Sequence, residues 1–226
     1  MPSTQQLPTG SALSVLKDST SNPNTWFDLT KNSIVSCFVS GTMIALPEGD
    51  RLVEELRPGD LILTADGQAL PLRWLGRSTI SRFFADPLRI LPVRIKAGAL
   101  GENMPARDLL LSPGHGIRIG DLLVHASALV NGASVVRDED APLVFTYYHI
   151  ELDTHTLVLA EGVPAESFLD QVEAVDFDNW EERKAPAAEE EMPYPRVKSP
   201  RQLPRALRSA LVGRANALFR PLARAA

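Results

Sequence analysis

Residues 36–67, SCFVSGTMIALPEGDRLVEELRPGDLILTADG, decide the fold class of this chain. Short runs with strand character alternate with turn signals at Pro47–Asp50, Pro58–Asp60 and Asp66-Gly67. This alternation is typical of β-hairpins and meanders. The stretch contains Cys37, the only cysteine of the chain, at the seam where a polar leader gives way to strand-forming sequence. The position of this thiol therefore needs an explanation.

Similar short runs continue as far as residue 160 and predict an all-β domain over about residues 37–170. The pattern Gly-Asp-Leu-x-Leu/Val occurs at Gly59–Leu63 and again at Gly120–Val124, which hints at duplicated halves. Further strands are predicted at Leu88–Ile95, Asp108–Leu111, Gly116–Ile119, Leu122–His125, Val135–Arg137, Val144–Leu152 and Thr156–Ala160.

Residues 1–36 are rich in Ser, Thr, Asn, Gln and Pro, with little hydrophobic periodicity. They are expected to form a flexible leader with one short helical turn near Ala12–Lys17. The start of the chain lacks the basic and then apolar pattern of a secretory signal, and no 18 uninterrupted apolar residues occur, so no transmembrane helix is predicted. We therefore expect a cytoplasmic protein, with non-classical export left open.

The chain carries a net charge of −5 over 226 residues, which gives no reason to expect a nucleic-acid partner. A single cysteine excludes an intramolecular disulfide. A zinc site built from Cys37 and histidines is disfavoured, because the local spacing is not that of a structural site. We expect no metal and no cofactor.

Residues 171–226 form an acidic segment followed by a basic one. In the basic part Leu207, Leu211, Leu218 and Leu222 share one helical face, which predicts an amphipathic helix at 203–222. Such a helix suits contact with an anionic membrane surface or with a partner protein. It equally suits neutralisation of the acidic segment, or a solvated tail.

Two further segments carry residues suited to chemistry. LLLSPGHGI places Ser112 and His115 three residues apart across a Pro-Gly turn. YYHIELDTHTLVLAEGV contains His149 and His155 six residues apart, a spacing that puts both on the same face of an extended strand. A thiol with nearby histidines fits nucleophilic acyl chemistry, since imidazole can transfer protons near neutral pH. His125 is expected to be structural.

Taken in this order, the three segments resemble the Hint domain, the self-processing module shared by hedgehog proteins and inteins. The chain resembles the bacterial intein-like Hint proteins rather than full inteins that carry a homing endonuclease. The resemblance covers roughly residues 34–168 and implies an all-β, horseshoe-shaped domain with pseudo-twofold halves. It also implies that the Cys37 thiol attacks the carbonyl of Ser36, converting the peptide bond into a thioester. The leader would then be the substrate.

The resemblance further implies roles for the other residues. His115 would protonate the departing amine, and Ser112, in place of the family's threonine, would hydrogen-bond the scissile amide or the oxyanion. His149 stands where many members carry aspartate or cysteine, so an imidazole could act there as base. His155 matches the family's late histidine, although the step that it serves in inteins is not expected here.

The end of the module departs from splicing inteins. Ala165-Glu166 stands where the family has His-Asn, and a glutamate has no side-chain nitrogen to cyclise, so ordinary splicing is not expected. Asn179 lies well downstream without a preceding histidine. The prediction is an N-to-S acyl shift at Ser36–Cys37 followed by hydrolysis or transfer to an unknown nucleophile. The alternatives are a non-cleaving Hint-fold binding or tethering module and, less favoured, a cysteine protease acting in trans.

Overall fold

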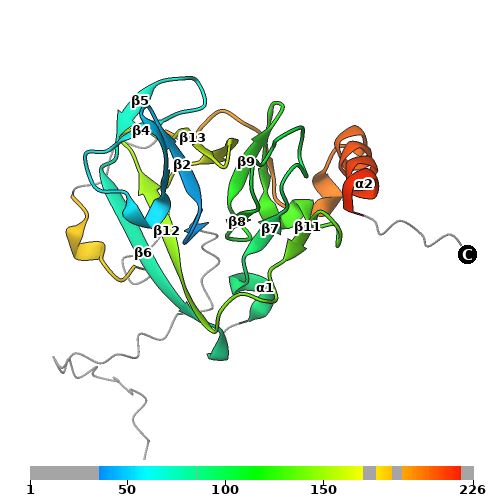
Figure 1. Ribbon diagram of the computed structural model, residues 1–226, viewed down its shortest axis with the longest axis horizontal. Coiled ribbons are helices and arrows are strands. Elements are labelled where there is room, and N and C mark those ends of the chain that lie inside the picture. The colour runs from blue at the N-terminus through cyan, green and yellow to red at the C-terminus, as the bar shows by residue number, and fades with distance from the viewer. Residues whose placement is uncertain (1–35, 85, 170–176, 185–189, 220–226) are drawn as a thin grey trace, which may run out of the picture.

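Short strands make up most of the computed structural model, which describes residues 36–84, 86–169, 177–184 and 190–219 (Figure 1). The predicted leader helix near Ala12–Lys17 lies outside the described residues. The strands are β1 (Phe38–Val39), β2 (Met43–Leu46), β3 (Gly49–Leu52), β4 (Leu61–Leu63), β5 (Ala69–Pro71), β6 (Trp74–Ser81), β7 (Val93–Ile95), β8 (Leu109–Leu111), β9 (Gly116–Ile119), β10 (Leu122–His125), β11 (Val135–Arg137), β12 (Val144–Glu151), β13 (Leu157–Ala160), β14 (Val163–Glu166) and β15 (Arg196–Val197). The α-helices of the described residues are α1 (Pro87–Ile90) and α2 (Arg205–Phe219). The all-β prediction is confirmed.

Two large sheets organise these strands. One has the order β11-β7-β8-β1-β12-β6, and the other has the order β15-β10-β9-β14-β13-β2-β3. A small third sheet pairs β4 with β5. The two-residue strand β1 lies inside the first sheet, between β8 and β12, with Phe38 opposite both Leu111 and Tyr148. Cys37 directly precedes β1, so the Ser36–Cys37 bond leads directly into the interior of the molecule.

The repeated five-residue pattern begins at the same structural feature in both copies. Gly59 and Gly120 both have positive φ, +99° and +60°, in turns that precede β4 and β10. Glycine tolerates this backbone region because it lacks Cβ. In both copies, a turn with a positive-φ glycine thus precedes the strand.

The prediction of one strand at Leu88–Ile95 is wrong in its first half. Residues Pro87–Ile90 form α1, because the Asp86 side chain accepts a hydrogen bond from Leu88 N and Pro87 starts the helix with a suitable φ. Only Val93–Ile95 is a strand. The sequence prediction also missed β14 and β15.

The prediction that His149 and His155 share the face of one strand is also wrong. β12 ends at Glu151 and β13 starts at Leu157, so His155 lies in the connection between them. These two strands belong to different sheets. The six-residue spacing therefore spans a turn, and period-two reasoning does not apply across it.

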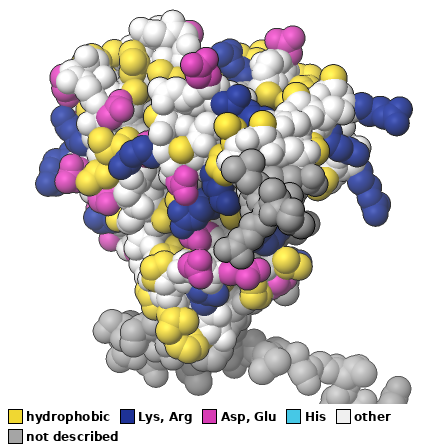
Figure 2. Space-filling model, turned by 45° about the vertical axis from the view of Figure 1, so that its right-hand side comes forward, with side chains coloured by type: hydrophobic (Ala, Val, Ile, Leu, Met, Phe, Trp, Pro, Cys, Tyr) yellow, Lys and Arg dark blue, Asp and Glu magenta, His cyan; other side chains and the backbone are white. Residues whose placement is uncertain are grey.

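The main hydrophobic core draws from both large sheets. Its largest fully buried side chains include Phe38, Ile44, Ile95, Leu109, Leu111, Ile117 and Ile150. Acidic and basic side chains are interspersed over the face drawn in Figure 2. Within the described residues, no helix is both long and apolar enough to cross a membrane.

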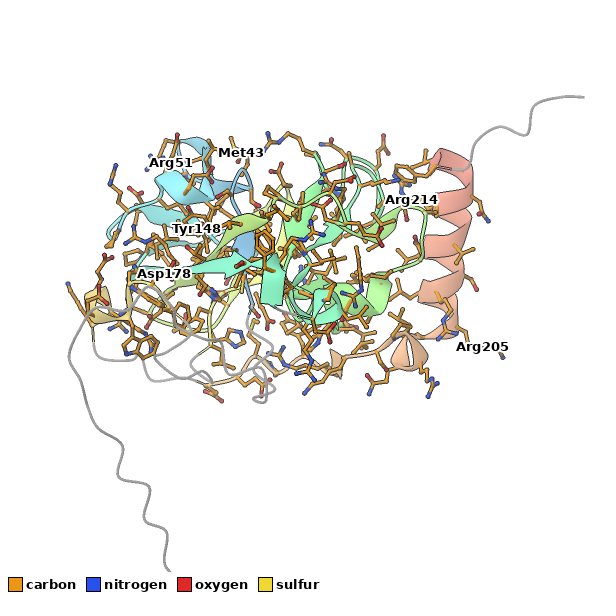
Figure 3. All side chains as sticks on the ribbon, turned by 90° about the horizontal axis from the view of Figure 1, so that it is seen from below. Met43, Arg51, Tyr148, Asp178, Arg205 and Arg214 are labelled. Atoms are coloured by element: carbon orange, nitrogen blue, oxygen red, sulfur yellow. The ribbon has the colours of Figure 1, made fainter. Side chains whose placement is uncertain are left out.

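Helix α2 packs at one end of the body, as Figures 1 and 3 show. Leu211 and Ala215 are buried, and Leu207 and Phe219 pack against the main core. The side chain of Arg214 points toward the body and hydrogen-bonds to the carbonyl of Gly98. Leu218, which the sequence pattern places on the same face, is 53% exposed. The buried stripe thus follows positions 207, 211, 215 and 219.

Candidate active site at the Ser36–Cys37 junction

The backbone of Cys37 is held by the turn that joins β8 and β9. Its amide N–H donates to Ser112 Oγ over 3.0 Å, and its carbonyl accepts from Ser112 N over 3.0 Å. Nδ1 of His115 lies 2.9 Å from the same carbonyl oxygen. The Pro-Gly turn therefore brings both predicted residues to Cys37.

The side chain of Cys37 lies in a small apolar cluster and is 5% exposed. Its neighbours in this cluster include Ile80, Leu91, Ala141, Phe145 and Tyr147. The hydroxyl of Tyr147 donates to the carbonyl of Ile90 over 2.8 Å, and burial raises its pKa well above the ordinary value. The thiol is thus shielded from bulk water.

His115 is fully buried between two carbonyl groups. Nδ1 faces the carbonyl of Cys37, and Nε2 lies 3.1 Å from the carbonyl of Glu166. The ring also packs edge-on against Phe38, with centroids 4.4 Å apart. Burial lowers the pKa of His115, although Glu166 and the two carbonyls oppose that shift. A neutral imidazole carries one N–H, so it can satisfy only one of these carbonyls at a time.

His149 contacts the other side of the scissile bond. It lies in β12, and it hydrogen-bonds to the backbone of Ser36. This contact favours the protonated ring, so its partner is the carbonyl oxygen. Burial, helped by the charge of His115, nevertheless lowers the pKa of His149 to about 3. The ring is therefore neutral at physiological pH, and its Nδ1 has no hydrogen-bond partner among the described residues.

An aromatic cluster covers His149. The ring centroids of Phe177 and Phe168 lie 4.7 and 5.7 Å from that of His149, both edge-on. Trp74 belongs to the same cluster, and Trp180 packs against it. Phe177 comes from a segment that Asn179 fastens to the edge of β6. This cover separates the imidazole from water.

Glu166 is a component of the site that the sequence prediction did not use. The carboxylate is 3% exposed and accepts from Ser36 Oγ at 2.5 Å and from Gly116 N at 2.8 Å. Burial alone would raise the pKa of Glu166, but His155, His115, Arg196 and Ser36 outweigh it and hold the pKa below the ordinary value. Its place at the end of the module was the available signal. Sequence reasoning assigns this position no role, because glutamate has no side-chain nitrogen to cyclise.

His155 lies beside Glu166 rather than at the scissile peptide. Its Nε2 is 3.6 Å from Oε2 of Glu166, too long for a good hydrogen bond but within ion-pair range, and its Nδ1 accepts from Met192 N at 3.4 Å. His125, at the end of β10 opposite Gly116, has a pKa lowered to about 4 by burial. No cluster suited to a metal ion occurs among His, Cys, Asp and Glu of the described residues.

The family model for the Hint domain matches residues 36–172 of this sequence. The chain belongs to the Hint domain family. The match starts at Ser36, one residue before the buried thiol, and includes every candidate site residue from Cys37 to Glu166. The Hint fold is thereby confirmed, and it is a fold suited to self-processing.

Several solved structures are similar to this Hint domain. The gp41-1 intein is 12% identical, with a TM-score of 0.40, and the similarity covers 57% of this chain and 97% of that one. The MchDnaB-1 intein is 16% identical, with a TM-score of 0.39, and the similarity covers 57% of this chain and 98% of that one. The bacterial intein-like domain from Clostridium thermocellum is 16% identical, with a TM-score of 0.40, and the similarity covers 59% of this chain and 98% of that one. A search of curated proteins found no match.

Proposed function

We propose that this Hint domain cleaves its own backbone at Ser36–Cys37 through an N-to-S acyl shift. The observation that carries the proposal is the contact between Ser112 Oγ and the scissile amide nitrogen, at 3.0 Å. The Ser36 carbonyl is meanwhile held by His149. The scissile nitrogen and the oxygen of the carbonyl that the thiol would attack are thus each contacted by a polar side chain inside a buried site.

In the first step the Cys37 sulfur attacks the carbonyl carbon of Ser36. Sulfur and the scissile nitrogen are both attached to the same residue, so rotation about χ1 brings the thiol to the carbonyl through a five-membered ring. The carbon–sulfur bond forms, the carbon–nitrogen bond breaks, and the thiol proton is lost while the departing amine gains one. The N–H of His149 supports the oxyanion that develops on Ser36.

The departing nitrogen is contacted by Ser112, whereas His115 contacts the carbonyl of the same residue. We assign His115 as the proton donor to the amine and Ser112 as the group that orients it. Because burial keeps its imidazole neutral, His115 first takes up the proton that the thiol releases, and the imidazolium so formed donates that proton to the departing amine. The resulting thioester is then cleaved by water or transferred to an external nucleophile.

Asparagine-driven splicing has no support in this chain. Glu166 carries no side-chain nitrogen, and the side-chain amide of Asn179 is hydrogen-bonded to the backbone of β6. Its Oδ1 accepts from Arg77 N at 2.8 Å and its Nδ2 donates to the carbonyl of Leu75 at 3.0 Å. The proposed reaction therefore ends with release or transfer of the leader.

The test is to express the full chain and measure intact masses with and without dithiothreitol or hydroxylamine. Processing predicts a thiol-accelerated fragment ending at Ser36, which disappears in Cys37→Ala. A chain that stays intact under every condition would overturn the proposal.

The packing of the Cys37 thiol among apolar neighbours favours one second candidate, a non-cleaving Hint module that binds or tethers. An intact chain in the same measurement would support it. Cleavage of an added peptide without cleavage of the chain itself would instead indicate a protease acting in trans.

A further inference from the structure

Glu166 is a buried carboxylate whose two oxygens face different partners. Oε1 accepts from Ser36 Oγ and from Gly116 N. Oε2 lies 2.9 Å from Nη2 of Arg196 and 3.6 Å from Nε2 of His155. Removing a charge from water is costly unless it is paired and hydrogen-bonded. Here each oxygen has such partners, and one of them is the side chain that precedes the scissile bond.

The backbone at Gly116 is shaped to admit this carboxylate. A Cβ built at Gly116 would lie 2.8 Å from Oε1 of Glu166 and 2.8 Å from Cγ of Leu123. Any other residue would therefore force the Glu166 carboxylate or the Leu123 side chain to shift. The close approach places Oε1 where it reaches the Gly116 amide and the Ser36 hydroxyl together.

The positive partner of Glu166 comes from outside the family match, which ends at residue 172. Arg196 starts β15, which pairs in parallel with β10 so that Arg196 lies opposite Leu123. Its Nε also donates to Glu191 over 2.6 Å. Val197, which follows it, is buried in the main core. The C-terminal segment thus delivers a fixed guanidinium to the junction.

We propose that Glu166, paired with Arg196, is a positioning residue that selects a hydroxyl side chain at position 36. This inference rests on the proposed cleavage at Ser36–Cys37. Anchoring the side chain of residue 36 fixes the orientation of its carbonyl relative to the Cys37 thiol and to His149. An apolar side chain there would leave Oε1 with one donor fewer, and an acidic one would be repelled.

The first experiment measures dithiothreitol-induced cleavage of the full chain with position 36 varied. Ser36→Thr keeps the hydroxyl, and we expect its rate to stay within about threefold of the unmodified chain. Ser36→Ala and Ser36→Val lose a hydrogen bond to a charged group, and we expect losses of about tenfold to a hundredfold. Equal rates for all four chains would overturn the inference while leaving the cleavage itself established.

The second experiment separates recognition from folding. In the Glu166→Gln background the hydrogen bond becomes neutral, and we expect Ser36→Ala to cost only about threefold. Glu161→Gln is the matched control, because Glu161 is also buried and paired with an arginine, Arg107, but contacts no part of the junction. In the Glu161→Gln background, Ser36→Ala must still lower the cleavage rate about tenfold to a hundredfold. If Ser36→Ala lowered the cleavage rate just as much in the Glu166→Gln background, the role of Glu166 would be refuted.

A third measurement does not need cleavage. In the Cys37→Ala background, which keeps the chain intact, urea unfolding midpoints are compared for Ser36→Ala, Glu166→Gln and the pair. Residues in contact give non-additive losses, whereas independent residues add. Absence of any cut in the unmodified chain would overturn the proposed function alone, and additive midpoints would overturn the contact between Ser36 and Glu166.

Discussion

Cys37 and Ser112 are joined by two hydrogen bonds that run in opposite directions. Cys37 N donates to the Ser112 hydroxyl, and Ser112 N donates to the Cys37 carbonyl, each over 3.0 Å. The pair links the residue directly before β1 to the turn after β8. The backbone of Cys37 is therefore fixed at its nitrogen by the Ser112 side chain and at its carbonyl by the Ser112 backbone.

Removal of the Ser112 hydroxyl should slow cleavage without unfolding the domain. We expect Ser112→Ala to lower the rate about tenfold to a hundredfold, because the scissile N–H loses its acceptor inside a buried site. Ser112→Thr should stay within about threefold, since the added methyl group restricts χ1 while keeping the oxygen. Hydroxylamine cleavage followed by intact mass measures both. An unchanged rate in Ser112→Ala would remove this residue from the mechanism.

The stability of the chain should fall as the pH is lowered from 7 toward 3. His149 has a folded-state pKa of about 3 against an ordinary value of 6.5. The unfolded chain therefore takes up a proton first, so the stability that His149 contributes is complete above pH 6.5 and is lost between 6.5 and 3. Urea unfolding at several pH values measures how the free energy of unfolding changes with pH. This dependence should become weaker in His149→Phe.

The control for this prediction is His125, whose pKa is lowered to about 4. His125→Phe should also reduce the slope, but it should leave cleavage at pH 7 within about threefold, because His125 does not contact the scissile peptide. His149→Phe should in contrast reduce cleavage strongly, since it removes the donor to the Ser36 carbonyl. Equal pH slopes in all three chains would contradict the assigned titration.

Two glycine substitutions should act in opposite directions. Gly116→Ala places a Cβ 2.8 Å from the Glu166 carboxylate, and we expect a loss of about 1–3 kcal/mol in unfolding free energy together with slower cleavage. Gly213→Ala lies in the interior of α2 with no heavy atom within 4 Å of the added carbon. This substitution should raise the free energy of unfolding by about 0.5–1 kcal/mol and leave the cleavage rate unchanged. Thermal unfolding of both variants checks the signs.

The segment that covers His149 should depend on Asn179. This side chain is 2% exposed and bonds two backbone groups of β6. Asn179→Ala leaves those groups unpaired and should cost about 2 kcal/mol. Asp178→Ala is the control, because Asp178 is exposed where it accepts from Thr79. Hydrogen exchange should show faster opening at residues 177–182 in Asn179→Ala only, and equal exchange in the two variants would contradict this account.

Sequence reasoning predicted most of the strands because their signals are local. The strands β9, β10 and β11 match their predicted bounds, since alternation and turn glycines act within a few residues. It failed at α1, where a capping aspartate and a proline overrode an apolar run, and at His155, where a turn interrupts the strand. The predicted domain bounds at 36/37 and 170/171 stay predictions.

The sequence by itself determined the all-β character, the family and the position of Cys37 at the start of the strand-forming sequence. Only the tertiary structure decided that Ser36 meets Glu166, 130 residues away, and that Arg196 compensates its charge. The physical reason is that strand periodicity reports burial on one face of a sheet but not which distant strand becomes the neighbour. Pairing of β9 with β14 and of β10 with β15 brings these side chains together.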